Sequence, residues 1–450
     1  MPNTIKLKKG LDIKLSGKAR RVLAGEIHPD LYGVKPVDFP GLVPKLSVRP
    51  DDMVFAGTTL FFNKMMPEIR FTSPVSGIVK NIVRGERRRL LEIVIEKKGN
   101  EYFSFGKADP DSLDRGKITE RLLESGLWPV IRQRPYHIVA NPLTSAKAIF
   151  ITCLDTSPLA PDYSFIMENI SGDLFRTGIR ALSKLTDGKI HLVLDGRAGA
   201  PDFITQQPGV EVTCFIGPHP AGNVGVHIHH IDPVNKGEFV WFVNLQDVVS
   251  IGRLFVEGIY KPEKIVALTG SEVINPQYYR ILSGGSIAPM VTGNVKLGDL
   301  RYISGNVLTG SKIENNGFIG FYDSQITVIP EGKYFEFFGW AKPGIDKFSF
   351  SRTFLSSVFR RKEYREDTNY HGGERAFVVT GQYEKVVPMD IYPMQLLKSI
   401  IAGDIELMEN LGIYEIAEED FALCEYICPS KTEIQSIVRK GIELMIKEMS

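Results

Sequence analysis

The sequence predicts a multidomain protein of mixed α/β and α+β class. Its 450 residues exceed what one ordinary core organises, and about 150 residues per domain is a useful prior. Short β-rich runs with glycine and proline turns fill the N-terminal part, apolar strands then alternate with helical patterns, and the C-terminal part carries helical periodicity only. We therefore expect four units: residues 1–104, 105–257, 258–330 and 331–450.

Charge and composition exclude several classes of function. Lysine and arginine total 54 against 53 acidic residues, so no global field attracts nucleic acid. The basic stretches 84–89 and 360–362 are short enough to be solvated surface, and 360–362 could also meet anionic lipid or a partner.

Cysteine use and hydropathy bear on the compartment. Four cysteines, at positions 153, 214, 424 and 428, do not form a disulfide framework, which favours a reducing compartment. The start lacks the apolar segment of a signal peptide. The most apolar long stretch, 239–256, is interrupted by polar residues, whereas a membrane span needs about 20 mostly apolar ones. Any membrane association is therefore expected to run through a partner.

The first unit, residues 1–104, shows alternating apolar positions between turns over 48–60 and 71–79. The strand that begins Ser73-Pro74-Val75-Ser76-Gly77 resembles the biotinyl/lipoyl barrel-sandwich hybrid, in which a lysine at a hairpin tip can be acylated. Here Lys64 lies nine residues before Ser73, about two more than lipoyl domains usually allow. The resemblance implies the fold and does not imply lipoylation.

The second unit, residues 105–257, alternates strands with helices. Buried strands are expected over 147–154, 189–194, 210–216 and 238–243, with a helix over 173–186. This order predicts a Rossmann-like, mostly parallel sheet. A nucleotide site would need a glycine-rich turn after the first strand. Instead, residues 155–162 contain two prolines and an acidic residue at each end, so we expect no phosphate loop.

A second turn, after the strand 189–194, could touch a phosphate. It carries Gly196, Arg197 and Gly199, two glycines with an arginine between them. A lone G-x-x-G of this kind is more typical of a plain surface turn than of a phosphate site, and both interpretations stay open.

The run from Gly217 to His230 holds four of the eight histidines. Zinc binding is one interpretation, because neutral imidazole is a common ligand. However, we expect His227 and His229 on one face of a strand and His230 on the other, with no helpful cysteine or carboxylate. We therefore predict no metal site but a rigid loop at the carboxyl edge of the sheet. Its candidates for a vestigial cofactor site or an interface are Gly217, His219, Gly222, His227 and His229.

The remaining chain divides into a small α+β unit and a helical end. Residues 258–330 return to short strands and glycine turns, and 393–449 fit helices. Between them, 339–374 is aromatic, basic and glycine-rich. This composition suits either an extension that grips a partner or a loop that covers the core of its own domain.

Cys424 and Cys428-Pro429 are spaced like the end of a ferredoxin cluster motif, C-x2-C-x2-C-x3-C-P. The two preceding cysteine positions are occupied by Phe421 and Glu418, which do not ordinarily replace thiolates. We interpret Cys424 and Cys428 as the remnant of a cluster motif. The alternative is two ordinary buried cysteines.

The order of these segments resembles the NqrA family, the A subunits of the sodium-translocating NADH:quinone oxidoreductase, a bacterial six-subunit complex. The resemblance is carried by Gly25 to Pro29, Ser73 to Gly77, the run 217–230 with Asp232-Pro233-Val234, Gly339-Trp340 with Lys342-Pro343-Gly344, and 424–429. Through the related Rnf complex C protein and the complex I flavoprotein, it implies a Rossmann-like second unit, a β-grasp third unit of the soluble-ligand-binding (SLBB) type, and a C-terminal helical bundle.

The resemblance also implies a function. The complex passes electrons from NADH through FAD, a 2Fe–2S cluster, FMN and riboflavin, all held in other subunits, to quinone, and it exports sodium. This chain would be a cofactor-free, peripheral subunit on the cytoplasmic face of the inner membrane. It would contact above all the B subunit, which lies in the membrane and bears quinone and FMN, with a possible share in the quinone site, and would be inactive alone. The alternatives are a free-standing flavin- or metal-dependent oxidoreductase, using the turn at 196–201 and the histidine loop, and an acyl carrier modified on Lys64.

Overall fold

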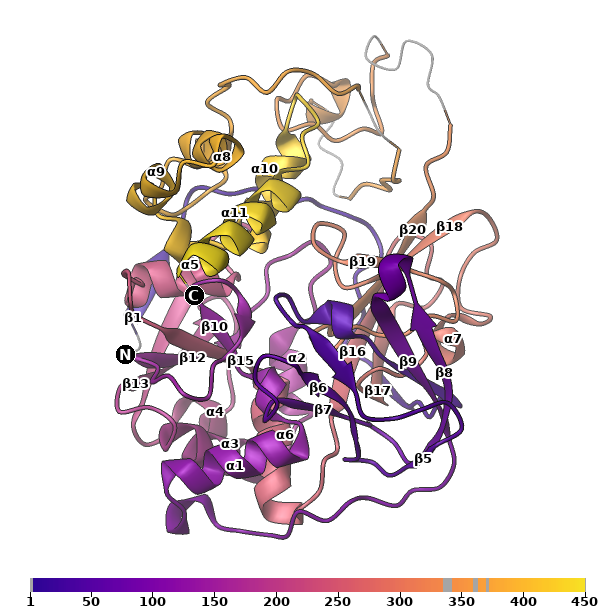
Figure 1. Cartoon of the computed structure of the whole chain (residues 1–450). Coiled ribbons are helices and arrows are strands. Elements are labelled where there is room, and N and C mark those ends of the chain that lie inside the picture. Colours follow the sequence, from indigo (N-terminus) through magenta and orange to yellow (C-terminus); the bar gives the residue numbers. More distant parts are fainter. Residues whose placement is uncertain (1–2, 335–341, 359–362, 370–371, 450) are drawn as a thin grey trace.

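The computed structural model describes residues 3–334, 342–358, 363–369 and 372–449. A seven-stranded sheet lies between two sets of helices, with two small β-sheets at its side and a further six-stranded sheet behind them (Figure 1). The C-terminal helices cover the upper end of the molecule in the same view. None of the helices in the described residues is long and apolar enough to cross a membrane.

The N-terminal β unit consists of two facing antiparallel sheets. One has the order β3 (Leu31–Val34), β9 (Leu90–Lys97), β8 (Gly77–Arg84) and β5 (Met53–Val54). The other has the order β4 (Pro44–Leu46), β6 (Thr59–Asn63) and β7 (Arg70–Thr72). The rings of Phe61 and Phe71 stack at 4.6 Å in the core between them. Lys64 directly follows β6, at the predicted hairpin tip.

The seven-stranded sheet has the order β1-β14-β13-β12-β15-β10-β11. Its five parallel strands are β1 (Asn3–Lys6), β14 (Val210–Ile216), β13 (Lys189–Asp195), β12 (Ala148–Cys153) and β15 (Val240–Asn244). β10 (Arg132–Arg134) and β11 (Ile138–Val139) add antiparallel pairs at one edge. All residues of β12 are buried, as expected for a strand with both faces covered.

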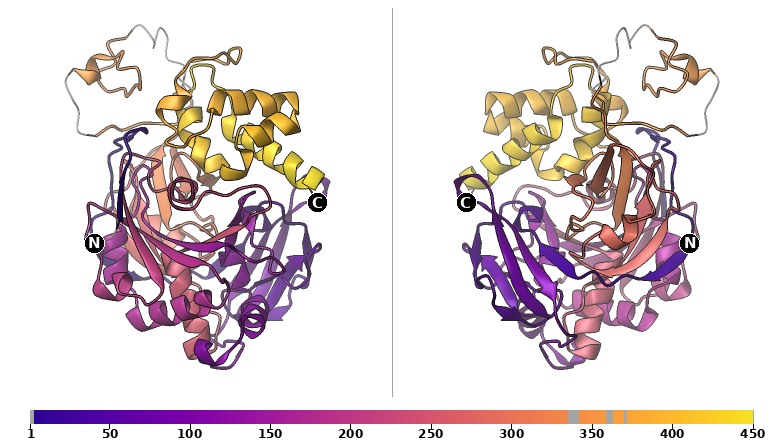
Figure 2. Two further views of the ribbon diagram at one scale, coloured as in Figure 1. Left: turned by 90° about the vertical axis from the view of Figure 1, so that its left-hand side faces the viewer. Right: turned by 90° about the vertical axis from the view of Figure 1, so that its right-hand side faces the viewer.

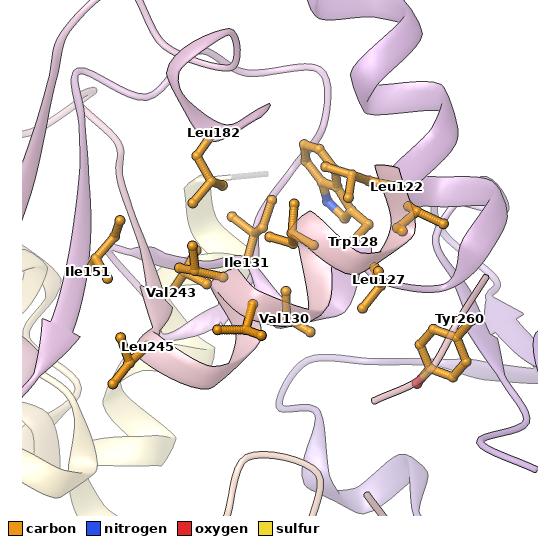
Figure 3. Close-up of a cluster of buried hydrophobic side chains, with 14 of the residues drawn as sticks. Leu122, Leu127, Trp128, Val130, Ile131, Ile151, Leu182, Val243, Leu245 and Tyr260 are labelled. Atoms are coloured by element: carbon orange, nitrogen blue, oxygen red, sulfur yellow. The ribbon is translucent and has the colours of Figure 1, made fainter. Parts of the chain in front are cut away.

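Helices cover both faces of this sheet. α1 (Arg115–Ser125), α2 (Tyr163–Glu168), α3 (Gly172–Ser183), α4 (Asp202–Thr205) and α6 (Leu245–Glu257) contribute to one core. Figure 3 shows part of that core, which includes Leu122, Trp128, Ile131 and Leu182. The indole of Trp128 donates to the Ala140 carbonyl (2.7 Å) and packs edge-on against Trp241. The opposite face packs on α5 (Val224–Ile231) and the C-terminal helices.

The six-stranded sheet has the order β19 (Ser311–Ile313), β18 (Leu300–Ser304), β20 (Gln325–Pro330), β16 (Glu263–Thr269), β17 (Gln277–Leu282) and β2 (Leu23–Glu26). One short helix, α7 (Ala288–Val291), packs beside it. The first 26 residues thus supply one strand to each of two sheets that are otherwise built from later residues.

The chain ends in four helices: α8 (Pro393–Ala402), α9 (Ile405–Asn410), α10 (Ala422–Ile427) and α11 (Ile434–Met449). Their buried faces share one core with Phe150 and Phe242 of the seven-stranded sheet. The helices therefore close the α5 face of the sheet and do not form a separate body.

The connection 331–392 contains little regular structure among its described residues. Tyr364 pairs with residues 14–16 through backbone bonds of 2.7 and 2.8 Å, and Arg365 pairs with Glu272 (2.6 Å), so this part lies on the body. Residues 342–358 stand off from the body in Figure 2. Of the predicted extension, 339–341, 359–362 and 370–371 lie outside the described residues.

Candidate functional site: the carboxyl edge of the sheet and its helical cover

The turn after β12 stands where a nucleotide-binding sheet would hold a phosphate. The Asp155 carboxylate accepts from the Ser157 backbone N–H (2.7 Å), and the Thr156 hydroxyl accepts from the Gly222 N–H (2.8 Å). A Cβ at Gly222 would lie 2.5 Å from the Thr156 nitrogen, so this approach requires glycine. Thr156 is thus engaged by the segment 217–230, and Asp155 by the turn itself.

The histidine segment forms a helix, and the prediction of a strand here was wrong. Residues 224–231 are α5, so His227, His229 and His230 do not alternate across a sheet. Glycine and β-branched residues give the segment weak helix propensity, which made the pattern ambiguous. Burial of Val224, Val226 and Ile228, and the Phe215 ring against His227 (4.7 Å), explain why it is helical.

His219 and His227 are buried structural groups. The His219 ring contacts the Thr156 hydroxyl (3.2 Å), and His227 Nε2 lies 2.8 Å from the Ala221 carbonyl. Burial lowers the pKa of His219 and of His227 to about 4, so both rings are neutral at pH 7.

His229 connects α5 to the C-terminal helices. Its Nδ1 lies 2.6 Å from the Glu415 carboxylate, and its Nε2 accepts from the Asp390 backbone N–H (3.0 Å). His230 turns back to the Val226 carbonyl (2.9 Å). The four histidines therefore point to different partners. Within the described residues, no three histidine, cysteine or acidic side chains are grouped so that they could hold a metal ion.

Beside α5 lies a buried ion-pair network that sequence reasoning missed. Arg134 of β10 has 1% of its side chain exposed and pairs with Asp420 (3.1 Å) and Glu419 (2.9 Å). The Asn223 amide donates to the Glu419 carbonyl and to the Asp420 carboxylate. Burial raises the pKa of Asp420, and Arg134 opposes that effect. The only signal in the sequence was two arginines, Arg132 and Arg134, beside apolar residues. This pattern does not indicate which acidic residues they bind.

Cys424 lies in α10, which begins two residues after Asp420, and Cys428 directly follows that helix. Cys424 and Cys428 are buried, and the Tyr383 hydroxyl donates to Cys428 Sγ (2.9 Å). Burial raises the pKa of the Cys428 thiol, but that hydrogen bond and backbone N–H groups lower it below its ordinary value. Phe421, at one missing cysteine position, is fully buried.

Glu418 occupies the other missing position. Its carboxylate lies 2.9 Å from Arg439 and 3.6 Å from His137. Burial raises the pKa of Glu418, but the neighbouring His137 and the charge of Arg439 outweigh it and hold the pKa at about 2. A carboxylate that lies between Arg439 of α11 and His137 of the β10–β11 turn thus stands where a cluster thiolate would be expected.

The turn after β13 meets the histidine loop at one point. The Arg197 guanidinium donates to the Gly217 carbonyl (2.9 Å), and Gly196 packs on Ile216, whereas Gly199 faces open space. Next to this turn an open groove of about 1110 Å³ runs over β13, β14 and the end of α5. Its walls include Ala198, His191 and His230. His191 Nδ1 is buried and has no hydrogen-bond partner among the described residues.

Comparisons with known proteins cover nearly the whole chain. Family models described as the NqrA N-terminal barrel-sandwich hybrid domain, the NqrA second alpha/beta domain and the NQRA C-terminal domain match residues 5–98, 113–260 and 265–315. The first of these confirms the predicted barrel-sandwich hybrid.

Curated relatives named as the A subunit of Na(+)-translocating NADH-quinone reductase share 38–40% identity with this chain. The one from Yersinia pseudotuberculosis is 40% identical over 97% of this chain and 98% of its own length. Those from Hahella chejuensis and Neisseria meningitidis are 38% identical over 99% of this chain and their full length. A crystal structure of an NAD+-reducing NiFe-hydrogenase covers 75% of this chain and 62% of its own at 10% identity, with a TM-score of 0.40, too low a similarity to carry an argument.

Proposed function

Because this chain belongs to the NqrA family, the A subunits of the Na+-translocating NADH-quinone reductase, we propose that it is the peripheral A subunit of such a complex. The complex couples oxidation of NADH and reduction of quinone to sodium export. The single observation that carries this proposal is 40% identity over 97% of the chain.

The second part of the proposal is that this subunit holds no cofactor. FAD, the 2Fe–2S cluster, FMN and riboflavin belong to the other subunits. Three contacts support it: Thr156 and Asp155 are each engaged within the chain at the phosphate position, and Glu418 pairs with Arg439 at a cluster position. We also propose that residues 105–257 are Rossmann-like, that 258–330 are a β-grasp domain of the SLBB type, and that a helical bundle ends the chain.

The third part concerns the partner and place of the chain in the complex. We propose that it stabilises the quinone- and FMN-bearing B subunit of the membrane part from the cytoplasmic side and borders the quinone site. An obligate contact of this kind buries on the order of 2,000 Å² or more. The isolated chain is then inactive.

The proposal is tested on native membranes. The chain is tagged at its C-terminus, extracted in mild detergent and captured, and the eluate is assayed for sodium-stimulated NADH:quinone reduction. We expect the other subunits and the activity to copurify. Membranes with an untagged chain are the control. A chain that elutes alone from membranes in which the other subunits are intact would contradict the proposal.

A second candidate function is a free-standing oxidoreductase. The observation that favours it is the groove over β13 and β14, which is large enough for a ligand and has His191 in its wall. A flavin absorption spectrum, or a bound metal, in the isolated chain would support this function.

The remaining alternative is an acyl carrier modified on Lys64. Acylation of Lys64 would appear as a mass increment on its peptide, and the unmodified mass would exclude it.

A further inference from the structure

The positive charge of the chain is concentrated in one segment. Residues 342–362 contain six basic residues and one acidic residue, whereas the rest of the chain has 48 basic and 52 acidic ones, from totals of 54 and 53. The segment therefore carries a net charge of +5 in a chain whose total is +1. Its first part, residues 342–358, is described by the structure and is called the basic lobe here.

The basic lobe is a folded element that is attached to the body on one side. The Phe348 N–H donates to Glu366 (3.1 Å), and the Phe348 ring lies 5.6 Å from Tyr364 and 6.3 Å from Tyr426. Within the lobe, the Leu355 N–H bonds to the Pro343 carbonyl (2.9 Å). These contacts hold the lobe in the position in which Figure 2 shows it, away from the sheets.

The lobe exposes apolar side chains beside its cations. Leu355 and Val358 are 46% and 70% exposed, and a 3-10 turn over Leu355–Ser357 brings positions three apart onto one side. Ile345 is 51% exposed and follows Pro343, whose carbonyl accepts from the Leu355 N–H, by two positions. Lys342 and Arg352 are also exposed. Exposed apolar residues gathered with basic ones mark a surface that is covered in use.

Charge decides which partner fits this surface. The cytoplasmic leaflet of a bacterial membrane is anionic and attracts basic segments. By contrast, the cytoplasmic loops of membrane proteins are enriched in lysine and arginine and would repel the lobe. We propose that the basic lobe docks directly onto anionic phospholipid headgroups, with Ile345, Leu355 and Val358 at the level of the acyl boundary.

This inference rests on the proposed function in one respect only: the proposed function places the chain beside a membrane. It also revises the expectation that membrane contact runs solely through partner subunits. Residues 360–362 enter the argument through their charge alone.

Vesicle sedimentation tests the inference on the full isolated chain. We expect the chain to sediment with phosphatidylglycerol-containing vesicles and not with pure phosphatidylcholine vesicles, and to be released by salt, because salt screens exposed charges. The double variant Lys342→Glu/Arg352→Glu should lose roughly tenfold or more in apparent affinity. The triple variant Ile345→Ser/Leu355→Ser/Val358→Ser should also bind more weakly.

A matched control is available on another loop. Leu297 is fully exposed (102%), and Lys296 precedes it, so Lys296→Glu/Leu297→Ser changes the same residue types elsewhere. This variant should sediment like wild type. Circular dichroism checks that every variant is folded.

Three outcomes would overturn the inference. They are absence of binding to anionic vesicles, equal weakening by the control variant, and a photo-crosslinker at Val358 that labels a protein in native membranes instead of lipid. The copurification described above does not depend on lipid binding, so failure of one proposal is distinguishable from failure of the other.

Discussion

Arg134 joins the seven-stranded sheet to the C-terminal helices through a buried charge. Its guanidinium contacts Asp420 and Glu419, and Asn223 of the histidine loop binds the same two acidic residues. A buried ion pair adds little compared with apolar residues of the same shape, but the loss of one partner leaves a charge uncompensated. At the scale of single residues, this network is therefore the most sensitive point of the interface.

Arg134→Met should destabilise the protein by about 3–5 kcal/mol, because Asp420 and Glu419 would stay buried without their cation. The matched control is Lys236→Met, which breaks the Lys236–Glu409 pair between the same two parts of the chain. The Lys236 side chain is 61% exposed, and loss of its pair should cost about 0–1 kcal/mol. Urea unfolding followed by circular dichroism measures both. If both variants lost a similarly small amount of unfolding free energy, Arg134 would not be the key contact.

The buried histidines predict acid sensitivity. A histidine whose pKa is lowered in the folded state binds a proton more readily when unfolded, so stability falls as the pH drops from 6.5 toward 4. At pH 5, the lowered pKa of His219 and that of His227 should each reduce the free energy of unfolding by about 2 kcal/mol relative to pH 7.

His227→Gln tests this pH dependence, because glutamine keeps a donor for the Ala221 carbonyl but does not titrate. The loss of unfolding free energy between pH 7 and pH 5 should shrink by about 2 kcal/mol. His28→Gln, at a histidine whose side chain is 62% exposed, is the control and should behave like wild type. An unchanged loss in His227→Gln would refute the assignment.

At the scale of elements, close packing of helices determines where glycine is required. α3 and α6 cross at Gly178 and Gly252, and a Cβ at Gly252 would lie 1.8 Å from the Leu174 carbonyl oxygen. A Cβ at Gly178 would meet the Val248 carbonyl at 2.1 Å. Both neighbours are backbone atoms, which cannot turn aside, so the two helices approach each other only because these residues lack a side chain.

Gly252→Ala should therefore destabilise the protein by about 1–3 kcal/mol, although alanine has the higher helix propensity. Gly116 is exposed in the first turn of α1. A Cβ there would meet only the Asp114 carboxylate, at an ordinary contact distance of 3.4 Å. Gly116→Ala should be neutral or stabilise by up to about 1 kcal/mol. Thermal unfolding measures whether each variant is more or less stable than wild type. A stabilising Gly252→Ala would show that the helix crossing is looser than the structure indicates.

At the scale of the whole molecule, the first residues connect the seven-stranded sheet to the C-terminal helices. β1 pairs with β14, and the Leu7 N–H continues this pairing to the Ile216 carbonyl (2.8 Å). The Gly10 N–H then reaches the Lys385 carbonyl near the C-terminal helices (3.1 Å). One short segment thus contacts both the sheet and its helical cover.

A chain that begins at Gly10 lacks β1 and should unfold at a lower temperature. Loss of the partly buried Ile5 and Leu7 costs about 2 kcal/mol, which corresponds to roughly 4–8 °C in Tm for the part of the molecule affected. A chain that begins at Asn3 keeps β1 and serves as the control. Hydrogen exchange should locate the loss in β14 and leave β8 and β9 protected. Uniform loss of protection would contradict this account.

The sequence determined the elements whose signals are local. The apolar run of β12 fills both faces of a sheet, and the turns around 73–77 place the barrel-sandwich hybrid. Family membership likewise followed from motifs that can be compared one residue at a time, and the comparisons bear it out over nearly the whole chain.

Only the tertiary structure decided which distant groups meet. The helix at 224–231 exists because the sheet and the C-terminal helices bury it, against its weak propensity. Arg134 and Asp420 are 286 positions apart, and β1 and β2 lie in sheets built mainly from residues far along the chain. Such contacts depend on the burial and charge of groups brought together by folding, and a linear pattern carries local preference but not the identity of a distant partner.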